Sequence, residues 1–117
     1  MNTSALGRAV GAGTVLQVAM VVLGHYVPSL QAAGLFPIGG TLIGLVTGVL
    51  AGRGTPVGTG AAVVARTGGI AGGIAGALGS LVSTYLGDVP LANITIAGGS
   101  TLVTGALGGL LSRLGRK

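Results

Sequence analysis

The feature that most restricts the fold of this chain is the length of its uncharged segments. Four segments contain no Asp, Glu, Lys or Arg, at about residues 9–27, 30–52, 67–86 and 91–112. A helix needs about 20 mostly apolar residues to cross the hydrocarbon core of a bilayer. Only 6% of the 117 residues are charged, against about 25% in a soluble domain. We therefore predict an all-α integral membrane protein, a four-helix bundle that forms a single domain over residues 1–117.

A membrane β-barrel is the rival architecture, and the sequence disfavours it. Barrel strands need apolar and polar residues in alternation over about 10 residues. The segments 18–23 and 42–50 are continuously apolar or small and do not alternate. Because backbone groups in lipid must be hydrogen-bonded internally, helices remain as the expected structure.

The positions of the basic residues predict the orientation of the chain in the membrane. In a four-span topology all of them fall on one side: Arg8, Arg53, Arg66, Arg113, Arg116 and Lys117. Cytoplasmic loops carry the excess of Lys and Arg, so we expect both termini in the cytoplasm of a prokaryotic inner membrane. A cleaved signal peptide over the first segment is a weaker alternative, because its removal would break this pattern. Six basic and three aromatic residues are too few to suggest nucleic acid as a partner.

Glycine is unusually frequent, at 26 of 117 residues, and much of it recurs at four-residue spacing. Residues four apart lie on one face of a helix. Without side chains on that face, the backbone of a neighbouring helix can approach closely, which favours helix association in lipid. We expect glycine-zipper packing along three of the four helices. The expected packing residues are Gly40, Gly44, Gly48, Gly52, Gly68, Gly72, Gly76, Gly105 and Gly109. Such stripes also occur at oligomer interfaces and in pore linings, and all three uses stay open.

Catalytic chemistry is disfavoured by what the sequence lacks. The chain has no Cys, one acidic residue, Asp88, and one histidine, His25. General acid–base pairs and structural metal sites need more such groups than these. We therefore expect no enzymatic activity, no metal and no cofactor.

Three polar residues are candidates for a functional role, since polar groups within membrane segments are often functional. Gln17 lies in the middle of the first helix and can hydrogen-bond to a neighbouring helix. His25 and Asp88 fall in the two turns on the side opposite the arginines. A histidine–carboxylate pair there could act as a gate or pH sensor, whereas the simpler interpretation is two interfacial turn residues. Pro37 is expected to kink the second helix.

The two halves of the chain share short similar segments. Leu45–Gly48 is repeated as Leu102–Gly105, and Leu23–Pro28 resembles Leu86–Pro90 with one residue fewer. Duplication of a two-helix hairpin explains the similarity, with the copies related by an axis along the membrane normal. Chance similarity between low-complexity apolar segments is the alternative.

The segment Val27–Phe36, followed by a glycine-spaced helix, resembles the small four-helix Tmemb_14-type family of organelles and bacteria. That resemblance implies movement of lipids or porphyrins, although it covers about one helix. The overall pattern is also similar to small four-span prokaryotic membrane proteins of unassigned activity. Neither resemblance specifies functional residues.

These observations lead to two expectations for function. The first is a non-catalytic accessory or scaffold subunit, which docks on other membrane protein subunits through glycine faces not used internally. The second is an oligomeric channel or carrier for small solutes or lipids. An ion carrier usually has an ionisable group near mid-membrane, and the expected helices have none there. The accessory role is therefore preferred, with membrane lipids and other subunits, or further copies of the chain, as partners.

Overall fold

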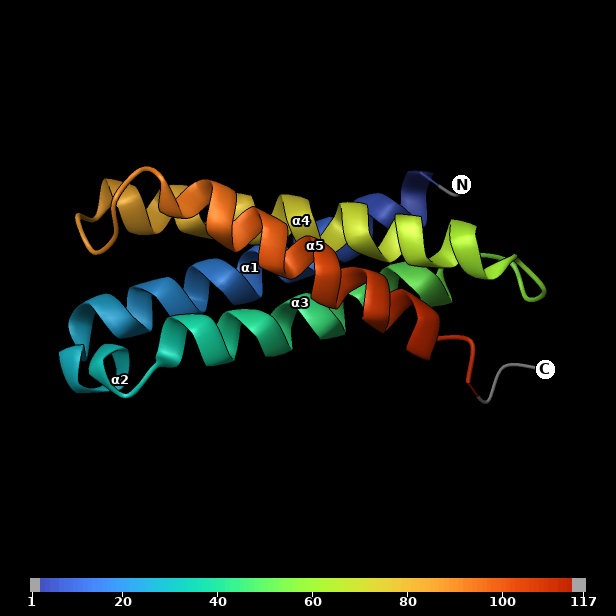
Figure 1. Cartoon of the computed structure of the whole chain (residues 1–117). Helices are drawn as coiled ribbons and strands as arrows, with labels where there is room; N and C mark the ends of the chain where they lie inside the picture. Colours follow the sequence, from blue (N-terminus) through green and yellow to red (C-terminus); the bar gives the residue numbers. More distant parts are fainter. Residues whose placement is uncertain (1–2, 115–117) are drawn as a thin grey trace.

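The structure, a computed structural model, describes residues 3–114 and is built from helices. In chain order they are α1 (Thr3–Tyr26), α2 (Pro28–Ala32), α3 (Leu35–Arg53), α4 (Ala61–Tyr85) and α5 (Asn93–Leu111). The four long helices lie side by side as a bundle, and α2 is a short turn that joins α1 to α3 (Figure 1). The all-α prediction is confirmed.

The four long helices match the dimensions of a membrane. Each is long and apolar enough to cross a bilayer, and the bundle measures 44 × 22 × 19 Å. A bilayer core is about 30 Å thick. The outward-facing surface of the bundle carries many exposed Leu, Ile and Val side chains, as expected where lipid is the solvent. These helices indicate an integral membrane protein.

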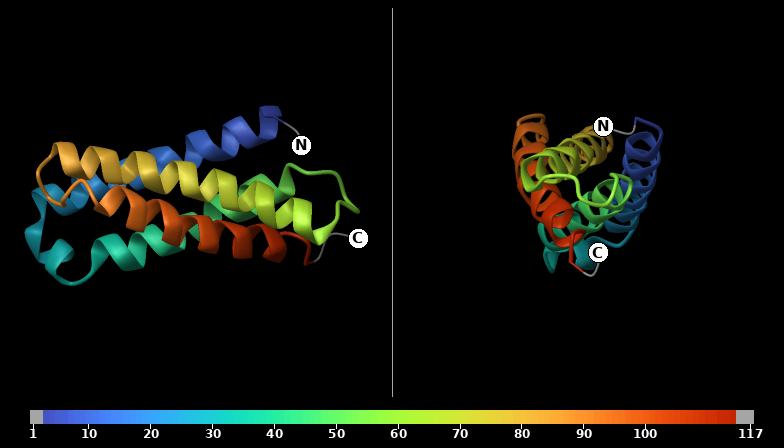
Figure 2. Two further views of the ribbon diagram at one scale, coloured as in Figure 1. Left: turned by 45° about the horizontal axis from the view of Figure 1, so that its top comes forward. Right: turned by 90° about the vertical axis from the view of Figure 1, so that its right-hand side faces the viewer.

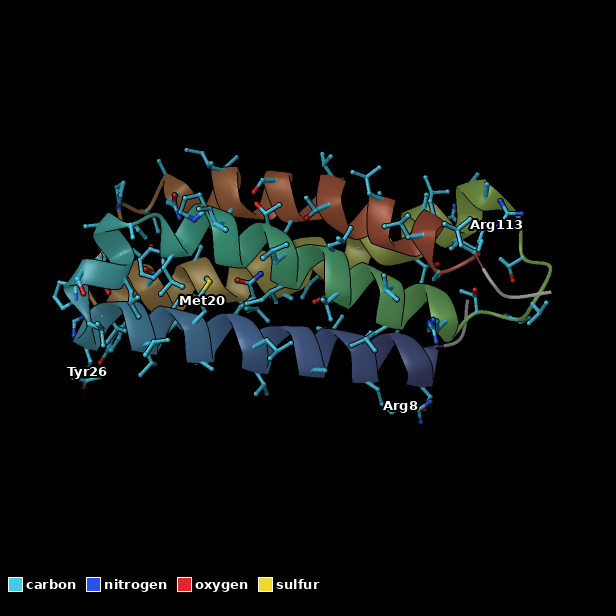
Figure 3. The ribbon with its side chains drawn as sticks, turned by 90° about the horizontal axis from the view of Figure 1, so that it is seen from below. Arg8, Met20, Tyr26 and Arg113 are labelled. Carbon is cyan, nitrogen blue, oxygen red and sulfur yellow. The ribbon has the colours of Figure 1, made fainter. Side chains whose placement is uncertain are left out.

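The bundle has two chemically different ends. The arginine end holds the start of α1, the segment 54–60 and residues 112–114, and the tyrosine end holds Tyr26, α2 and the segment 86–92. Figure 3 shows Arg8 and Arg113 at the first end and Tyr26 at the second. The exposed Tyr26 and Tyr85 side chains are of the kind that gathers at membrane–water interfaces.

The connection between the first two spans differs from the expected helix at 30–52. The chain forms the short helix α2, breaks at Gly34, and starts α3 at Leu35. Gly34 has a φ of 95°, in the left-handed region that glycine adopts most readily. Pro37 consequently lies in the first turn of α3. Backbone N–H groups in the first turn have no intrahelical acceptor, so a proline there removes no hydrogen bond of the helix. The expectation of a proline kink inside this helix was therefore wrong.

Two helices begin earlier than expected from the sequence. α1 starts at Thr3 rather than near residue 9, and α4 starts at Ala61 rather than near residue 67. Arg8 and Arg66 therefore lie inside helices, both of them exposed. A long basic side chain can extend from the first turns of a span to the headgroups. The positions of Arg8 and Arg66 therefore did not mark the starts of α1 and α4.

The helices are not arranged as a symmetric square. α5 packs against α3 and α4, and α1 packs against the same two helices. Within the described residues α1 and α5 are not in contact, whereas α3 and α4 meet across the middle of the bundle. The end-on view in Figure 2 shows α1 and α5 on opposite sides. The cross-section is therefore a rhombus with α3 and α4 on its short diagonal.

Candidate functional site

The candidate site arises because α3 and α5 diverge along their length. Toward the arginine end they touch: a Cβ built on Gly48 would overlap the carbonyl of Gly105, and one built on Gly52 would overlap Ser112. Gly44, one turn before Gly48, still abuts Thr101 and Thr104. One further turn toward the tyrosine end, Gly40 faces α1, where a Cβ would lie 3.6 Å from Gln17 Oε1. Beyond Gly44 the two helices therefore separate.

The separation leaves a cavity of about 520 Å³ in the tyrosine-end half of the bundle. All four long helices contribute to its lining, together with Gln31 of α2 and Val89 of the α4–α5 segment. This volume falls in the range of about 300–1,000 Å³ that is typical of small-molecule sites. Met20, labelled in Figure 3, points from α1 into the interior and forms part of the wall.

The innermost part of the lining comes from α1 and α4. Gln17 is 3% exposed, and its Nε2 donates a hydrogen bond to the carbonyl of Gly40 across the helix interface, at 3.2 Å. Ser80 Oγ accepts a hydrogen bond from Asn93 Nδ2 at 2.9 Å. Ser83 is 2% exposed, and its hydroxyl has no hydrogen-bond partner among the described residues. A buried hydroxyl without a partner costs free energy, so Ser83 is an unsatisfied polar group beside an open volume.

The opening of the cavity lies between α3 and α5. The lining residues that these two helices contribute include the exposed Pro37 and Thr41 on α3, and Ile96 and Ser100 on α5. Ile96 is 68% exposed. Because the lining from α1 and α4 is largely buried while the lining from α3 and α5 reaches the surface, access is lateral, between α3 and α5.

His25 and Asp88 meet at the tyrosine end. His25 Nδ1 lies 2.9 Å from Asp88 Oδ2, and the side chains are 31% and 14% exposed. The contact ties the last turn of α1 to the segment that follows α4. Val89, the neighbour of Asp88, lines the cavity. The pair therefore holds together two elements at the edge of the cavity, although neither residue lines it.

Five hydroxyl groups of α3 and α5 are bonded within their own helices. Thr47 Oγ1 donates to the carbonyl of Ile43 at 2.7 Å, and Thr101 Oγ1 donates to that of Ala97 at 2.7 Å. Thr41, Ser100 and Thr104 do the same. Such bonding to a preceding carbonyl satisfies a hydroxyl without a neighbouring helix.

The striped glycines named from the sequence mostly face neighbouring helices. Added Cβ atoms at Gly68 and Gly72 would overlap backbone carbonyls of α5, at Gly105 and Thr101, and Gly76 would overlap the Thr101 side chain. Gly105 and Gly109 in turn face backbone atoms of α4. Gly40 is different, because its nearest neighbours lie at ordinary van der Waals distance.

Three glycines within the long helices have no neighbour within 4 Å of a built Cβ: Gly7 and Gly11 on α1, and Gly99 on α5. Gly7 and Gly11 are one turn apart and exposed. They therefore lie on a face of α1 that is turned away from the bundle.

The basic residues that the structure describes are Arg8, Arg53, Arg66 and Arg113, and all four are exposed. They belong to the first turns of α1 and α4, the end of α3 and the segment after α5. These positions all lie toward the arginine end. Arg116 and Lys117 fall outside the described residues.

Sequence reasoning missed several residues of the site. Ser83 was not singled out, and Ser80 and Asn93 were given no role in a site. Gly79, against which Gln17 packs, was not among the predicted packing residues. Ser80 continues the four-residue series of Gly68, Gly72 and Gly76, and this regular spacing was a usable signal. The cavity itself depends on how far α3 and α5 diverge, which residue spacing does not encode.

No family model, curated protein or solved structure matches this chain. The resemblance to the Tmemb_14-type family therefore stays a prediction.

Proposed function

We propose that this protein is a non-catalytic accessory or scaffold subunit, which binds a transmembrane helix of a larger membrane complex through the outer face of α1. The observation that carries the proposal is the pair Gly7 and Gly11, with nothing within 4 Å of a Cβ built on either. Most other glycines in the long helices have close neighbours within the bundle. A small-residue face one turn long lets a partner backbone approach closely. Here that face is turned outward.

The tight packing of the arginine-end half supports the same proposal, because helix backbones meet inside it. In the arginine-end half, Gly48 lies against Gly105, and Gly68 against Gly105 and Gly109. Thr47 and Thr67, both buried there, bond to carbonyls of their own helices. Backbone contacts of this kind leave little room for a solute, which disfavours conduction through the monomer.

We further propose that the four-residue glycine series act as a zipper and that the chain arose by duplication of a hairpin. Equivalent residues of the two similar segments lie opposite each other on α3 and α5. Gly48 faces Gly105, Gly44 faces Thr101, and Gly52 faces Gly109. His25 and Asp88, which also align in the repeat, touch at the other end. Such pairing of equivalent positions is what a two-fold axis between α3 and α5 produces. The whole bundle does not keep that symmetry, because the axis would make the α3–α4 and α1–α5 contacts equivalent and, among the described residues, only α3 and α4 touch.

The proposed location is a prokaryotic inner membrane, with the arginine end in the cytoplasm. Four exposed arginines lie toward that end. Among the described residues, the other end has no arginine or lysine and carries the His25–Asp88 pair. The positive-inside rule relates such asymmetry to orientation. Anionic headgroups on the cytoplasmic leaflet would add to the attraction.

The test of the accessory role is a copurification experiment with outward-facing variants. Gly11→Leu adds a side chain where the partner helix is expected, so recovery of a stoichiometric partner from native membranes should fall about tenfold or more. Because nothing in the bundle lies near Gly11, the stability of the variant should match that of the parent. Gly99→Leu, at an equally open position on α5, is the matched control and should retain the partner. Equal recovery with both variants, or purification as a closed homo-oligomer alone, would contradict the proposal.

One observation favours the second candidate function, a carrier or oligomeric channel. The cavity of about 520 Å³ brings Gln17, Ser83 and Asn93 close to an opening between α3 and α5. A cavity that opens laterally between two membrane helices suits a carrier of lipids or other membrane-soluble molecules. The flux measurement described in the Discussion decides between the two functions.

A further inference from the structure

The strongest unexplained feature of the molecule is the combination of a large cavity and an unsatisfied hydroxyl. Ser83 is buried and lines the cavity, yet its Oγ has no partner among residues 3–114. Most buried polar groups in proteins are hydrogen-bonded, and each exception needs an explanation. A molecule that occupies the cavity and bonds to Ser83 would supply the missing partner.

The chemistry of the lining restricts what such a molecule can be. None of the described side chains that line the cavity is charged, and most of the lining surface is apolar. At the same end of the bundle, His25 and Asp88 bind each other at 2.9 Å, and neither lines the cavity. A charged ligand would lose its hydration without gaining a counter-charge. The ligand is therefore neutral, with an apolar body and a group that can bond to a serine hydroxyl.

The position of the opening identifies the phase from which the ligand enters. Thr41 and Ser100, at the rim, lie six or seven residues into α3 and α5, which at 1.5 Å per residue is about 10 Å below the helix starts. Ile38, Leu42 and Ile96 flank the opening with exposed apolar side chains. An opening at this depth faces lipid rather than bulk water. The occupant is therefore soluble in the membrane.

We propose that the cavity between α3 and α5 is a binding site for a neutral, membrane-soluble amphiphile that bears a hydroxyl or carbonyl group. Its polar group hydrogen-bonds to the Ser83 hydroxyl on α4, once a change of χ1 rotamer turns that buried hydroxyl toward the cavity. Gln17 and the Ser80–Asn93 pair lie near this position. Its apolar part lies against Met20, Phe36 and Ile96. The site does not depend on the outer face of α1, so the docking proposal and this one can fail separately.

Photolabelling of the purified protein in lipid nanodiscs with a diazirine-bearing octanol tests this site. We expect label on the segments 79–83 and 93–101, mapped by mass spectrometry. Excess octanol should suppress that label, whereas octane lacks the hydrogen-bonding group and octanoate carries a charge, so neither should compete. Displacement by octane as effective as by octanol would overturn the proposal, because it would indicate a merely apolar crevice. Label confined to lipid-facing positions of α3 and α5 would overturn it as well.

Two substitutions provide the matched comparison. Ser83→Ala removes the unpartnered hydroxyl and should lower the octanol-protected label about fivefold, the effect of one hydrogen bond. The fold should keep its stability, because that hydroxyl makes no bond within the chain. Thr14→Val removes the other buried hydroxyl that lacks a partner among the described residues. Thr14 does not line the cavity, so this substitution should leave the label unchanged. Ala97→Leu narrows the cavity from α5 and should abolish the label. Equal labelling in the parent protein and in Ser83→Ala would refute the assigned role of Ser83.

Discussion

The two halves of the bundle are built from the same helices but pack in different ways. In the arginine-end half, α3, α4 and α5 touch backbone to backbone, as where Gly48 and Gly68 both meet the carbonyl of Gly105. In the tyrosine-end half, the Gln17, Met20 and Phe36 side chains line the space between the helices. The four-residue glycine series of α3 runs through both halves, from Gly40 to Gly52. Glycine spacing therefore permits close packing, while the divergence of the helices decides where it occurs.

The largest effect on stability is expected when glycine is replaced by alanine in the arginine-end half, compared with the same replacement in the tyrosine-end half. In Gly48→Ala the new Cβ overlaps a backbone carbonyl, which cannot move without shifting α5. We expect a loss of about 1–3 kcal/mol in the free energy of unfolding. In Gly40→Ala the nearest atoms lie at 3.6 and 3.8 Å, so stability should be unchanged or slightly raised by the higher helix propensity of Ala.

Unfolding in mixed detergent–SDS micelles, followed by circular dichroism, measures both values. Val22→Leu, at an exposed position on α1, serves as a control for changes in surface apolarity. If Gly40→Ala and Gly48→Ala lost the same stability, the proposed difference between the halves would not hold.

A smaller effect on the free energy of unfolding is expected from breaking the His25–Asp88 contact at the tyrosine end. Asp88→Asn removes the carboxylate charge that faces His25 at 2.9 Å. Because both side chains are partly exposed, we expect a loss of about 1 kcal/mol or less. A double-mutant cycle with His25→Ala measures the coupling free energy directly. Additive effects of the two substitutions would mean that the contact does not stabilise this end.

The smallest effect on stability is expected for Gln17→Leu. The bond from Gln17 to Gly40 joins α1 to α3, and hydrogen bonds between membrane helices contribute about 0.6 kcal/mol on average. Liposomes containing the purified protein should show no flux of ions or small solutes, with or without this substitution. Robust flux in the parent that Gln17→Leu abolishes would support the carrier or channel in place of the accessory role.

Composition was sufficient to predict the general fold, because four uncharged segments of membrane-spanning length allow few alternatives. The break at Gly34 was missed because a single residue with positive φ ended a helix inside an uncharged segment of membrane-spanning length. Gln17 was recognised as a buried polar residue in a span, and its bond to Gly40 follows the reasoning that selected it. Ser83 gave no comparable signal, since a serine in a membrane helix usually bonds to its own backbone. Its unsatisfied state depends on the tertiary structure.

The rhombic cross-section has a consequence for the order in which the protein assembles. α1 is synthesised first, yet the glycines through which it meets the bundle face side chains: Gly13 faces Thr47, and Gly24 faces Phe36. The backbone-to-backbone contacts belong to α3, α4 and α5, and α5 supplies the central surface for the other two. We expect α1 to be inserted in the bilayer but only loosely associated with α3 and α4 until α5 has been synthesised and completes the core. The helix that is synthesised first, α1, is thus the last to reach its final position in the bundle.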